Sequence, residues 1–127
     1  MTMLDTRTGI DAALHQLNQA HTASRWQFRT LNCDDYGNAS IVFGCGSDRL
    51  VVFHGNDGTV ACTDDHYNLV DPDSVGIDAA ACAAVLAEWP AAAAAHHLVA
   101  TAVTGDDRLY ARHDGWVDTP GLGWETR

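Results

Sequence analysis

Four short stretches of alternating apolar and polar residues follow one another between residues 25 and 63, and turn-forming residues separate them. The stretches are residues 25–33 (RWQFRTLNC), 39–44 (ASIVFG), 49–54 (RLVVFH) and 59–63 (TVACT). Their lengths and their β-branched and aromatic content are typical of strands. Asn56, Asp57 and Gly58 tolerate the positive φ angles of a tight hairpin turn. Successive strands with such short connections predict a four-stranded antiparallel meander.

Pairing the strands through these turns is expected to place apolar side chains on both faces of the sheet. One face would carry Trp26, Phe28, Val42, Val51, Phe53, Val60 and Cys62. The other face would carry Leu31, Ile41, Phe43, Leu50 and Val52. An antiparallel sheet with one face in water would alternate apolar and polar residues instead. Because large apolar patches are rarely exposed on monomers, the pattern predicts either helices on both faces or an interface, as in a homo-oligomer.

Amphipathic periodicity predicts one helix before these strands and one after them. The apolar stripe of residues 8–21 consists of Ile10, Leu14, Leu17 and His21. The stripe of residues 77–89 consists of Ile77, Ala81, Ala84, Val85 and Trp89. Ser74 or Asp73 is expected to cap the second helix, and Pro90 to stop or kink it. Residues 91–95 could then begin a short third helix, which His96 and His97 would end.

The remaining residues predict a C-terminal β-hairpin and a tail. Residues 98–103 and 109–112 are expected to pair around a turn at residues 105–107, and residues 114–127 to form a loosely structured tail. The fold class is therefore α+β, in a single domain over residues 1–127. Its expected order is an N-terminal helix, a four-stranded antiparallel meander, one or two helices and a C-terminal β-hairpin.

The charge of the chain restricts its partners. Seven arginines and no lysine stand against 17 acidic residues, so the formal net charge is −10. Such a chain repels nucleic-acid phosphates and anionic membrane surfaces, which excludes direct nucleic-acid binding and membrane binding as leading functions. It favours a cationic partner: a basic protein, a basic peptide or a metal ion. The alternative is that the acidity serves solubility alone.

The cysteines and the chain start bear on the cellular compartment. Cys33, Cys45, Cys62 and Cys82 are widely spaced and form no C-x-x-C pair. Because no secretory-signal pattern opens the chain, we expect these thiols to be reduced and mostly buried, and the protein to be cytoplasmic. No apolar stretch approaches the length of a membrane-spanning helix.

The best candidate site is the acidic segment of residues 64–76 (DDHYNLVDPDSVG). Its candidate partner-binding residues are Asp64, Asp65, His66, Asp71 and Asp73. These side chains could steer a basic partner, hold a divalent metal, or only cap helices and contact water. Further candidates are Asp106 and Asp107 for steering and Trp116 and Trp124 as anchors, although these tryptophans could instead pack back on the protein.

Signs of catalysis are weak. Cys33 and His54 could form a nucleophile–base pair on one sheet face, but nothing in their spacing requires it. We therefore expect no catalytic residue, no resident metal and no cofactor. The leading hypothesis is a small acidic cytoplasmic module that binds a basic protein, as an immunity protein, inhibitor or chaperone does. The alternatives are a small metal-dependent or His-based hydrolase built on His54 and His66, and a self-associating assembly subunit.

Overall fold

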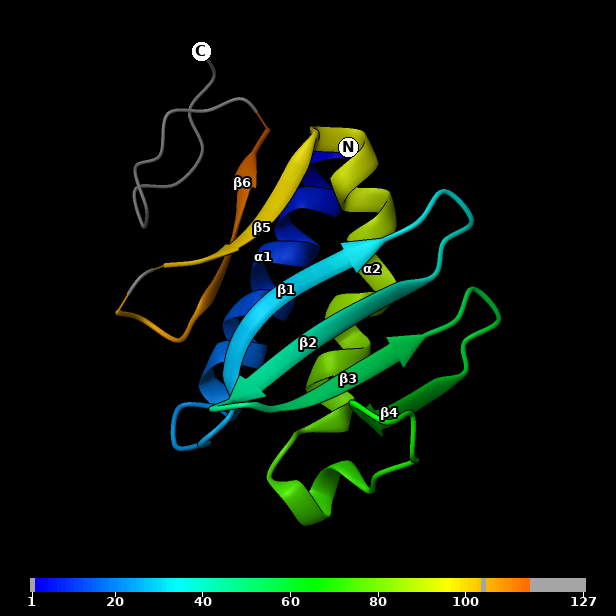
Figure 1. Cartoon of the computed structure of the whole chain (residues 1–127). Helices are drawn as coiled ribbons and strands as arrows, with labels where there is room; N and C mark the ends of the chain where they lie inside the picture. Colours follow the sequence, from blue (N-terminus) through cyan, green and yellow to red (C-terminus); the bar gives the residue numbers. More distant parts are fainter. Residues whose placement is uncertain (1, 104, 115–127) are drawn as a thin grey trace.

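The computed structural model describes residues 2–103 and 105–114, with side chains described from residue 9 onward, and it has the predicted α+β fold (Figure 1). The elements follow one another as α1 (Thr2–Ala20), β1 (Gln27–Cys33), β2 (Ala39–Cys45), β3 (Asp48–His54), β4 (Val60–Asp64), the 3₁₀ helix η1 (Pro72–Val75), α2 (Ala79–His96), β5 (Leu98–Ala102) and β6 (Leu109–His113). Strands β1 to β4 form one antiparallel sheet in sequence order, and β5 and β6 form a separate hairpin. The predicted meander and C-terminal hairpin are thus confirmed.

The pairing of the strands corrects the expected division of side chains between the two faces. A β-bulge between Phe28 and Thr30 shifts the register of β1, so Phe28 lies opposite Phe43 and Leu31 lies opposite Ile41. All four of these side chains are buried. The bulge adds one residue to the strand, so both parts of β1 direct an apolar residue to the same face. The expected position of Phe28 on the opposite face from Phe43 was wrong.

Two apolar residues of strand β4 also lie on the other face of the sheet than expected. Cys62 pairs with Val52, and Val60 pairs with His54, so both residues of β4 lie on the helix side of the sheet. The hairpin closes between Gly55 and Thr59, whose backbone groups are hydrogen-bonded at 2.8 Å. The turn thus includes one residue more on each side than the Asn-Asp-Gly tripeptide, and this fixes which residues oppose each other.

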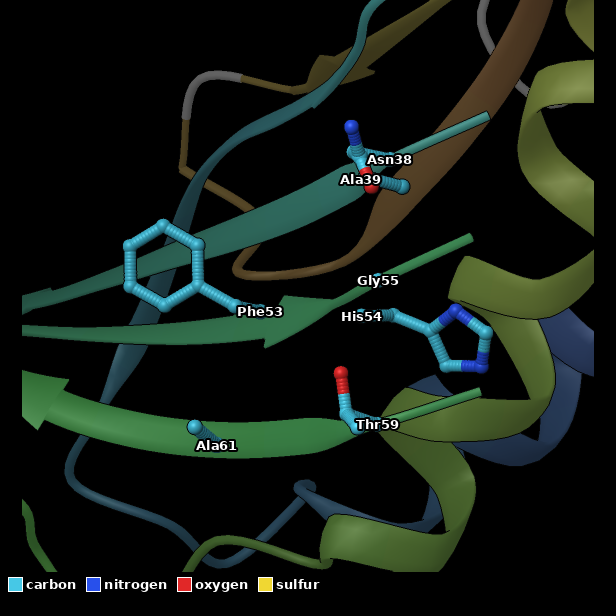
Figure 2. A pocket seen from close by; sticks show the side chains of 7 residues that line it. All are labelled: Asn38, Ala39, Phe53, His54, Gly55, Thr59 and Ala61. Carbon is cyan, nitrogen blue, oxygen red and sulfur yellow. The ribbon is translucent and has the colours of Figure 1, made fainter. Parts of the chain in front are cut away.

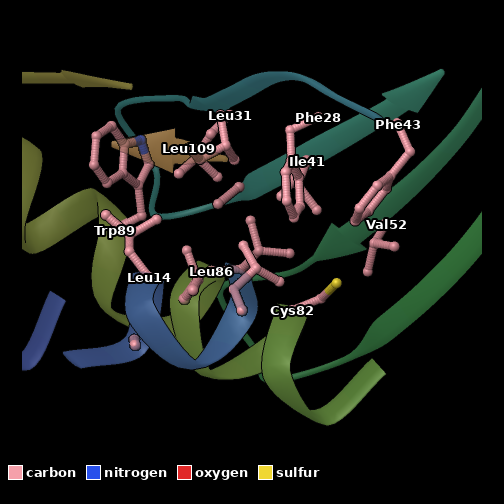
Figure 3. Packing of buried hydrophobic residues seen from close by; sticks show 14 of the residues in the cluster. Leu14, Phe28, Leu31, Ile41, Phe43, Val52, Cys82, Leu86, Trp89 and Leu109 are labelled. Atoms are coloured by element: carbon pink, nitrogen blue, oxygen red, sulfur yellow. The ribbon is translucent and has the colours of Figure 1, made fainter. Parts of the chain in front are cut away.

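Both helices pack on one face of the four-stranded sheet (Figure 1). Their apolar side chains meet Ile41, Phe43 and Val52 in one continuous core (Figure 3). The opposite face carries no helix among the described residues, and we call it the outer sheet face. By strand pairing, its residues are Gln27, Thr30, Asn32, Ser40, Val42, Gly44, Arg49, Val51, Phe53, Ala61 and Thr63. It is less apolar than expected, because Phe28, Val60 and Cys62 lie on the other side.

Helix α1 is longer than expected, but its predicted stripe is correct. Ile10, Leu14, Leu17 and His21 are all buried. The buried His21 ring links the end of α1 to the start of α2. One ring nitrogen lies 2.8 Å from the carbonyl oxygen of Leu17, and the other accepts the backbone N–H of Asp78 at 3.0 Å. The ring also packs against Phe28 and Phe43.

Helix α2 corrects three expectations. Its N-cap is Asp78, whose side chain accepts the N–H of Ala81, whereas Asp73 and Ser74 lie in η1. Ala84, placed in the apolar stripe, is exposed. The helix also continues through Pro90 to His96, so there is no separate third helix in this part of the chain.

Burial on both sides of Pro90 explains the continuous helix. A proline removes one helical hydrogen bond, here the one to the carbonyl of Leu86. Leu86, Trp89 and Ala92 are buried against the rest of the core, and their packing outweighs that loss. His97 ends the helix, as predicted; its backbone is left-handed and its N–H donates to the carbonyl of Ala93.

The side chain of Asn18 links the β5–β6 hairpin to α1. The amide of Asn18 donates to the carbonyl of Leu109 at 2.9 Å and accepts the N–H of the same residue at 3.0 Å. Leu109 itself is fully buried. In Figure 1 the hairpin lies beside β1, so it extends the structure past that edge of the sheet.

Candidate functional site

The acidic segment begins with a tight turn that the carboxylate of Asp64 organises. This carboxylate accepts the backbone N–H groups of His66 and Asn68, each at 2.9 Å, and the side-chain amide of Asn68 at 3.2 Å. The backbone closes between Asp64 and Asn68 at 3.0 Å. The chain then returns along β4, where Thr63 and Leu69 form an isolated bridge.

A second turn in the molecule has the same construction. The carboxylate of Asp34 accepts the N–H groups of Tyr36 and Asn38 and the side-chain amide of Asn38. Its backbone also closes at 3.0 Å, between Asp34 and Asn38. Residues 34–38 (DDYGN) and 64–68 (DDHYN) are therefore two copies of one turn, related as D-D-x-x-N.

The two turns differ at the fourth position, which is left-handed in both. Gly37 occupies it in the first turn with φ 86°, and Tyr67 occupies it in the second with φ 63°. Glycine adopts this conformation without strain, whereas a bulky side chain does so at a cost. Such strain is found most often at functional sites. Residue 67 is therefore a tyrosine where the fold alone would favour glycine.

The second turn also exposes apolar side chains. Tyr67 is 83% exposed and Leu69 is 81% exposed, although the segment around them is held by the hydrogen bonds of Asp64. Neither residue was a candidate in the sequence analysis. The sequence signal that would have found Tyr67 is the comparison of DDHYN with DDYGN, which shows a tyrosine in a glycine position.

The predicted acidic residues surround these two side chains along the chain. Asp65, His66, Asp71 and Asp73 are exposed, and His66 lies 3.5 Å from Asp65. Hydrogen bonds from Asn68 and His66 lower the pKa of Asp64, so it is charged at neutral pH. Asp71 also caps η1 by accepting the N–H of Asp73 at 3.2 Å. We call residues 64–73 the acidic loop.

The acidic loop has the donor atoms for a metal but no other sign of one. Ligand atoms of Asp64, Asp65 and His66 lie within 4.8 Å of one another, and Asp65 and His66 are exposed. The Asp64 oxygens already accept three hydrogen bonds that shape the turn. A cation here would therefore be held mainly by two solvent-exposed side chains.

The other predicted binding residues are not part of the acidic loop. Asp106 and Asp107 lie in the β5–β6 turn. In Figure 1 this hairpin lies beside the β1 edge of the sheet, whereas the acidic loop follows β4 at the opposite edge. Arg108 donates to both carboxylate oxygens of Asp106, at 2.9 and 2.6 Å, and lowers the pKa of Asp106 to about 2. The charge of Asp106 is thus compensated within the turn, whereas Asp107 is exposed. Trp116 and Trp124 lie outside the described residues.

The hypothetical Cys33–His54 pair is not assembled. Cys33 pairs with Ala39, and Ala39 pairs with His54, so a whole strand separates them. Two strand spacings amount to about 10 Å, which is beyond hydrogen-bond reach. Partial burial, together with Asp34 and Asp35, also raises the pKa of the Cys33 thiol, the opposite of an activated nucleophile. None of the four cysteines forms a disulfide; Cys62 and Cys82 are buried, while Cys45 is half-buried and Cys33 exposed.

A small pocket lies next to His54 at the end of the sheet that holds the β1–β2 and β3–β4 turns (Figure 2). Its volume is about 230 Å³, below the usual range of small-molecule sites. The lining residues are Asn38, Ala39, Phe53, His54, Gly55, Thr59 and Ala61. Figure 2 shows the His54 ring directed toward α2 and the Phe53 ring directed away from it. The His54 Nδ1 atom is buried without a hydrogen-bond partner.

Comparisons of the chain with models of protein families, with curated proteins and with solved structures found no match. Within the described part of the chain, no helix is both long and apolar enough to cross a membrane.

Proposed function

We propose that this protein is a non-enzymatic binding module that engages a basic protein through its acidic loop. The observation that supports this most directly is Tyr67, an exposed aromatic residue held in a left-handed conformation between acidic side chains. Tyrosines of this kind are enriched among the residues that dominate binding energy.

The acidic loop combines two properties that a binding surface needs. Asp65, Asp71 and Asp73 provide negative charge, which speeds the encounter with a cationic surface. Tyr67 and Leu69 provide apolar area that a partner can bury. Because Asp64 and the Thr63–Leu69 bridge already hold the backbone, little conformational entropy is lost on binding.

An immunity protein, an inhibitor and a chaperone all act by such stoichiometric binding, and we place the module in the cytoplasm with one of these roles. The separation of Cys33 from His54 supports binding over thiol catalysis. The metal-dependent alternative would need a cation held mainly by two exposed side chains, Asp65 and His66.

The two copies of the D-D-x-x-N turn allow a controlled test. The wild-type protein is immobilised, and proteins that it captures from its native host are compared with those captured by a Tyr67→Ala/Leu69→Ala double variant. Tyr36→Ala is the matched control, because Tyr36 is 79% exposed in the equivalent turn at the other end of the sheet. We expect a basic protein that wild type and the Tyr36 variant retain and the double variant loses. Equal capture by all three proteins would contradict the proposal.

A further inference from the structure

His21 is a buried titratable residue to which the proposed function gives no role. It is 5% exposed, whereas the other six histidines of the chain are all half-buried or exposed. A histidine can gain a proton in the physiological pH range. A buried one whose ring nitrogens both have partners therefore couples the fold to pH.

The partners of the two ring nitrogens determine which of them carries the hydrogen. Nδ1 lies 2.8 Å from the carbonyl oxygen of Leu17, an atom that can only accept, so Nδ1 must be the donor. Nε2 lies 3.0 Å from the backbone nitrogen of Asp78, whose N–H donates to it, so Nε2 must be the acceptor. The folded structure thus holds a neutral His21 ring with its hydrogen on Nδ1.

The bond between His21 and Asp78 holds the junction at which η1 passes into α2. Asp78 is the N-cap of α2, and its carboxylate accepts the N–H of Ala81 at 3.0 Å. Trp26 holds the other side of the same junction, because its indole N–H donates to the carbonyl of Val75 at 2.9 Å. The His21 ring thereby ties the end of α1 to the start of α2.

The sheet offers a protonated His21 ring no hydrogen-bond acceptor. From β1 and β2 the ring meets Phe28 and Phe43, two residues of the core, at centroid distances of 5.6 and 5.3 Å (Figure 3). From α1 it meets the carbonyl of Leu17, which is already bonded to Nδ1. A charge buried in such surroundings is costly unless it is paired.

The ionisable residues next to the ring do not supply a free counter-charge. The Asp78 carboxylate is engaged in the cap of α2. Cys82, one turn further along α2, is an uncharged thiol, because burial raises its pKa to about 12. In the loop after α1, Arg25 is exposed, and its positive guanidinium lies over the Trp26 ring, 5.1 Å from the centroid. A proton on Nε2 would therefore either face the Asp78 N–H or draw the Asp78 carboxylate away from its cap.

We infer that His21 is an acid-sensitive latch, which holds α1 on the η1–α2 junction when the ring is neutral and releases it when the ring is protonated. A histidine in an unfolded chain takes up a proton near pH 6.5. Because the closed latch requires the neutral ring, the unfolded state binds more protons as the pH falls. The stability that the latch provides is thus present above about pH 6.5 and is lost below it. Carboxylates in unfolded chains titrate near pH 4, so the turns formed by aspartates respond in a separate range.

The first experiment compares urea unfolding of the full chain at pH 7.5 and pH 5.5 in three proteins. These are the wild type, His21→Gln and His15→Gln. Glutamine carries an acceptor and a donor, as the ring does, but it does not titrate. Over this range the unfolding equilibrium constant should rise about tenfold more in the wild type than in His21→Gln. His15 is exposed on the same helix, so His15→Gln is the matched control and should follow the wild type.

The second experiment uses the wild type alone and so does not depend on a variant that folds. Nitrogen-15 NMR of the His21 ring at pH 7.5 should show neutral imidazole with its hydrogen on Nδ1. Amide hydrogen exchange then follows the Asp78 N–H, whose acceptor is the ring. Its protection factor, corrected for the intrinsic effect of pH, should fall about tenfold between pH 7.5 and pH 5.5.

Equal pH dependence of unfolding in the wild type and His21→Gln would overturn this inference. So would a folded protein whose His21 ring carries its hydrogen on Nε2, or an Asp78 amide whose protection does not change with pH. The proposed function is tested separately, because it depends on Tyr67 and Leu69 of the acidic loop and on neither of the residues changed here.

Discussion

At the scale of single residues, Tyr67 shows how the chain departs from what its fold alone would favour. The equivalent position in the twin turn is Gly37, which has the same left-handed backbone. A residue with a Cβ atom costs about 1–2 kcal/mol in this conformation. Cysteine spacing and strand pattern could be read from the sequence, but this cost could not, because φ at residue 67 depends on how Asp64 closes the turn.

We expect Tyr67→Gly to raise the free energy of unfolding by about 1 kcal/mol, since it removes the left-handed strain. The same variant should bind the partner more weakly, because the aromatic side chain is gone. Urea unfolding measures the first effect, and capture from the host measures the second. Gly37→Ala is the reciprocal control: a Cβ there meets the nearest atom at 3.5 Å, so it should destabilise through backbone strain alone. An unchanged or lower stability of Tyr67→Gly would argue against strain at this position.

At the scale of elements, the sequence predicted the order and type of the helices and strands but not three details of how they are built and joined. The bulge between Phe28 and Thr30 comes from tertiary packing that directs Phe28 and Leu31 into one core, and strict alternation could not reveal it. The continuity of α2 through Pro90 likewise depends on burial of Trp89 and Ala92. The link between Asn18 and Leu109 joins residues 91 positions apart, so no local pattern indicates it.

We expect Asn18→Ala to loosen the β5–β6 hairpin. It leaves the backbone N–H and carbonyl of the buried Leu109 without partners, which costs about 1–3 kcal/mol. Amide hydrogen exchange should accelerate in β5 and β6 and stay unchanged in β2 and β3. Gln19→Ala is the control, because that neighbouring side chain is exposed. Uniform acceleration across the sheet would indicate that the hairpin is not held separately by this link.

At the scale of the whole molecule, the acidic residues serve the fold as well as any partner. Side-chain and backbone hydrogen bonds lower the pKa of Asp34 and Asp57 below the ordinary value of 3.8, through Asn38 and Thr59 respectively. Hydrogen bonds from Asn68 and His66 lower the pKa of Asp64 in the same way. The acidity of these turns was visible in the sequence, but its division between turn formation and exposed charge required the structure.

Acid should destabilise the protein through these turns. A carboxylate whose pKa is lower in the folded than in the unfolded state stabilises the fold above the unfolded value of about 4. That stability is lost as the pH falls through the folded pKa. We therefore expect the urea concentration at the unfolding midpoint to decrease as the pH is lowered below 4. It should decrease less steeply in an Asp34→Asn/Asp64→Asn variant, because asparagine keeps an oxygen acceptor without titrating. A midpoint that rises between pH 4 and pH 3 would contradict this account.

The most direct test of the proposed function is the binding kinetics of the captured partner on the wild-type protein, from low to high salt. If exposed carboxylates steer the encounter, the association rate falls steeply as salt rises. Asp65→Asn/Asp73→Asn should then lower the association rate, whereas Tyr67→Ala should raise the dissociation rate. Asp64 is left unchanged, because its carboxylate holds the turn. An association rate that does not change with salt, together with unaltered binding by Tyr67→Ala, would show that the acidic loop is not the binding surface.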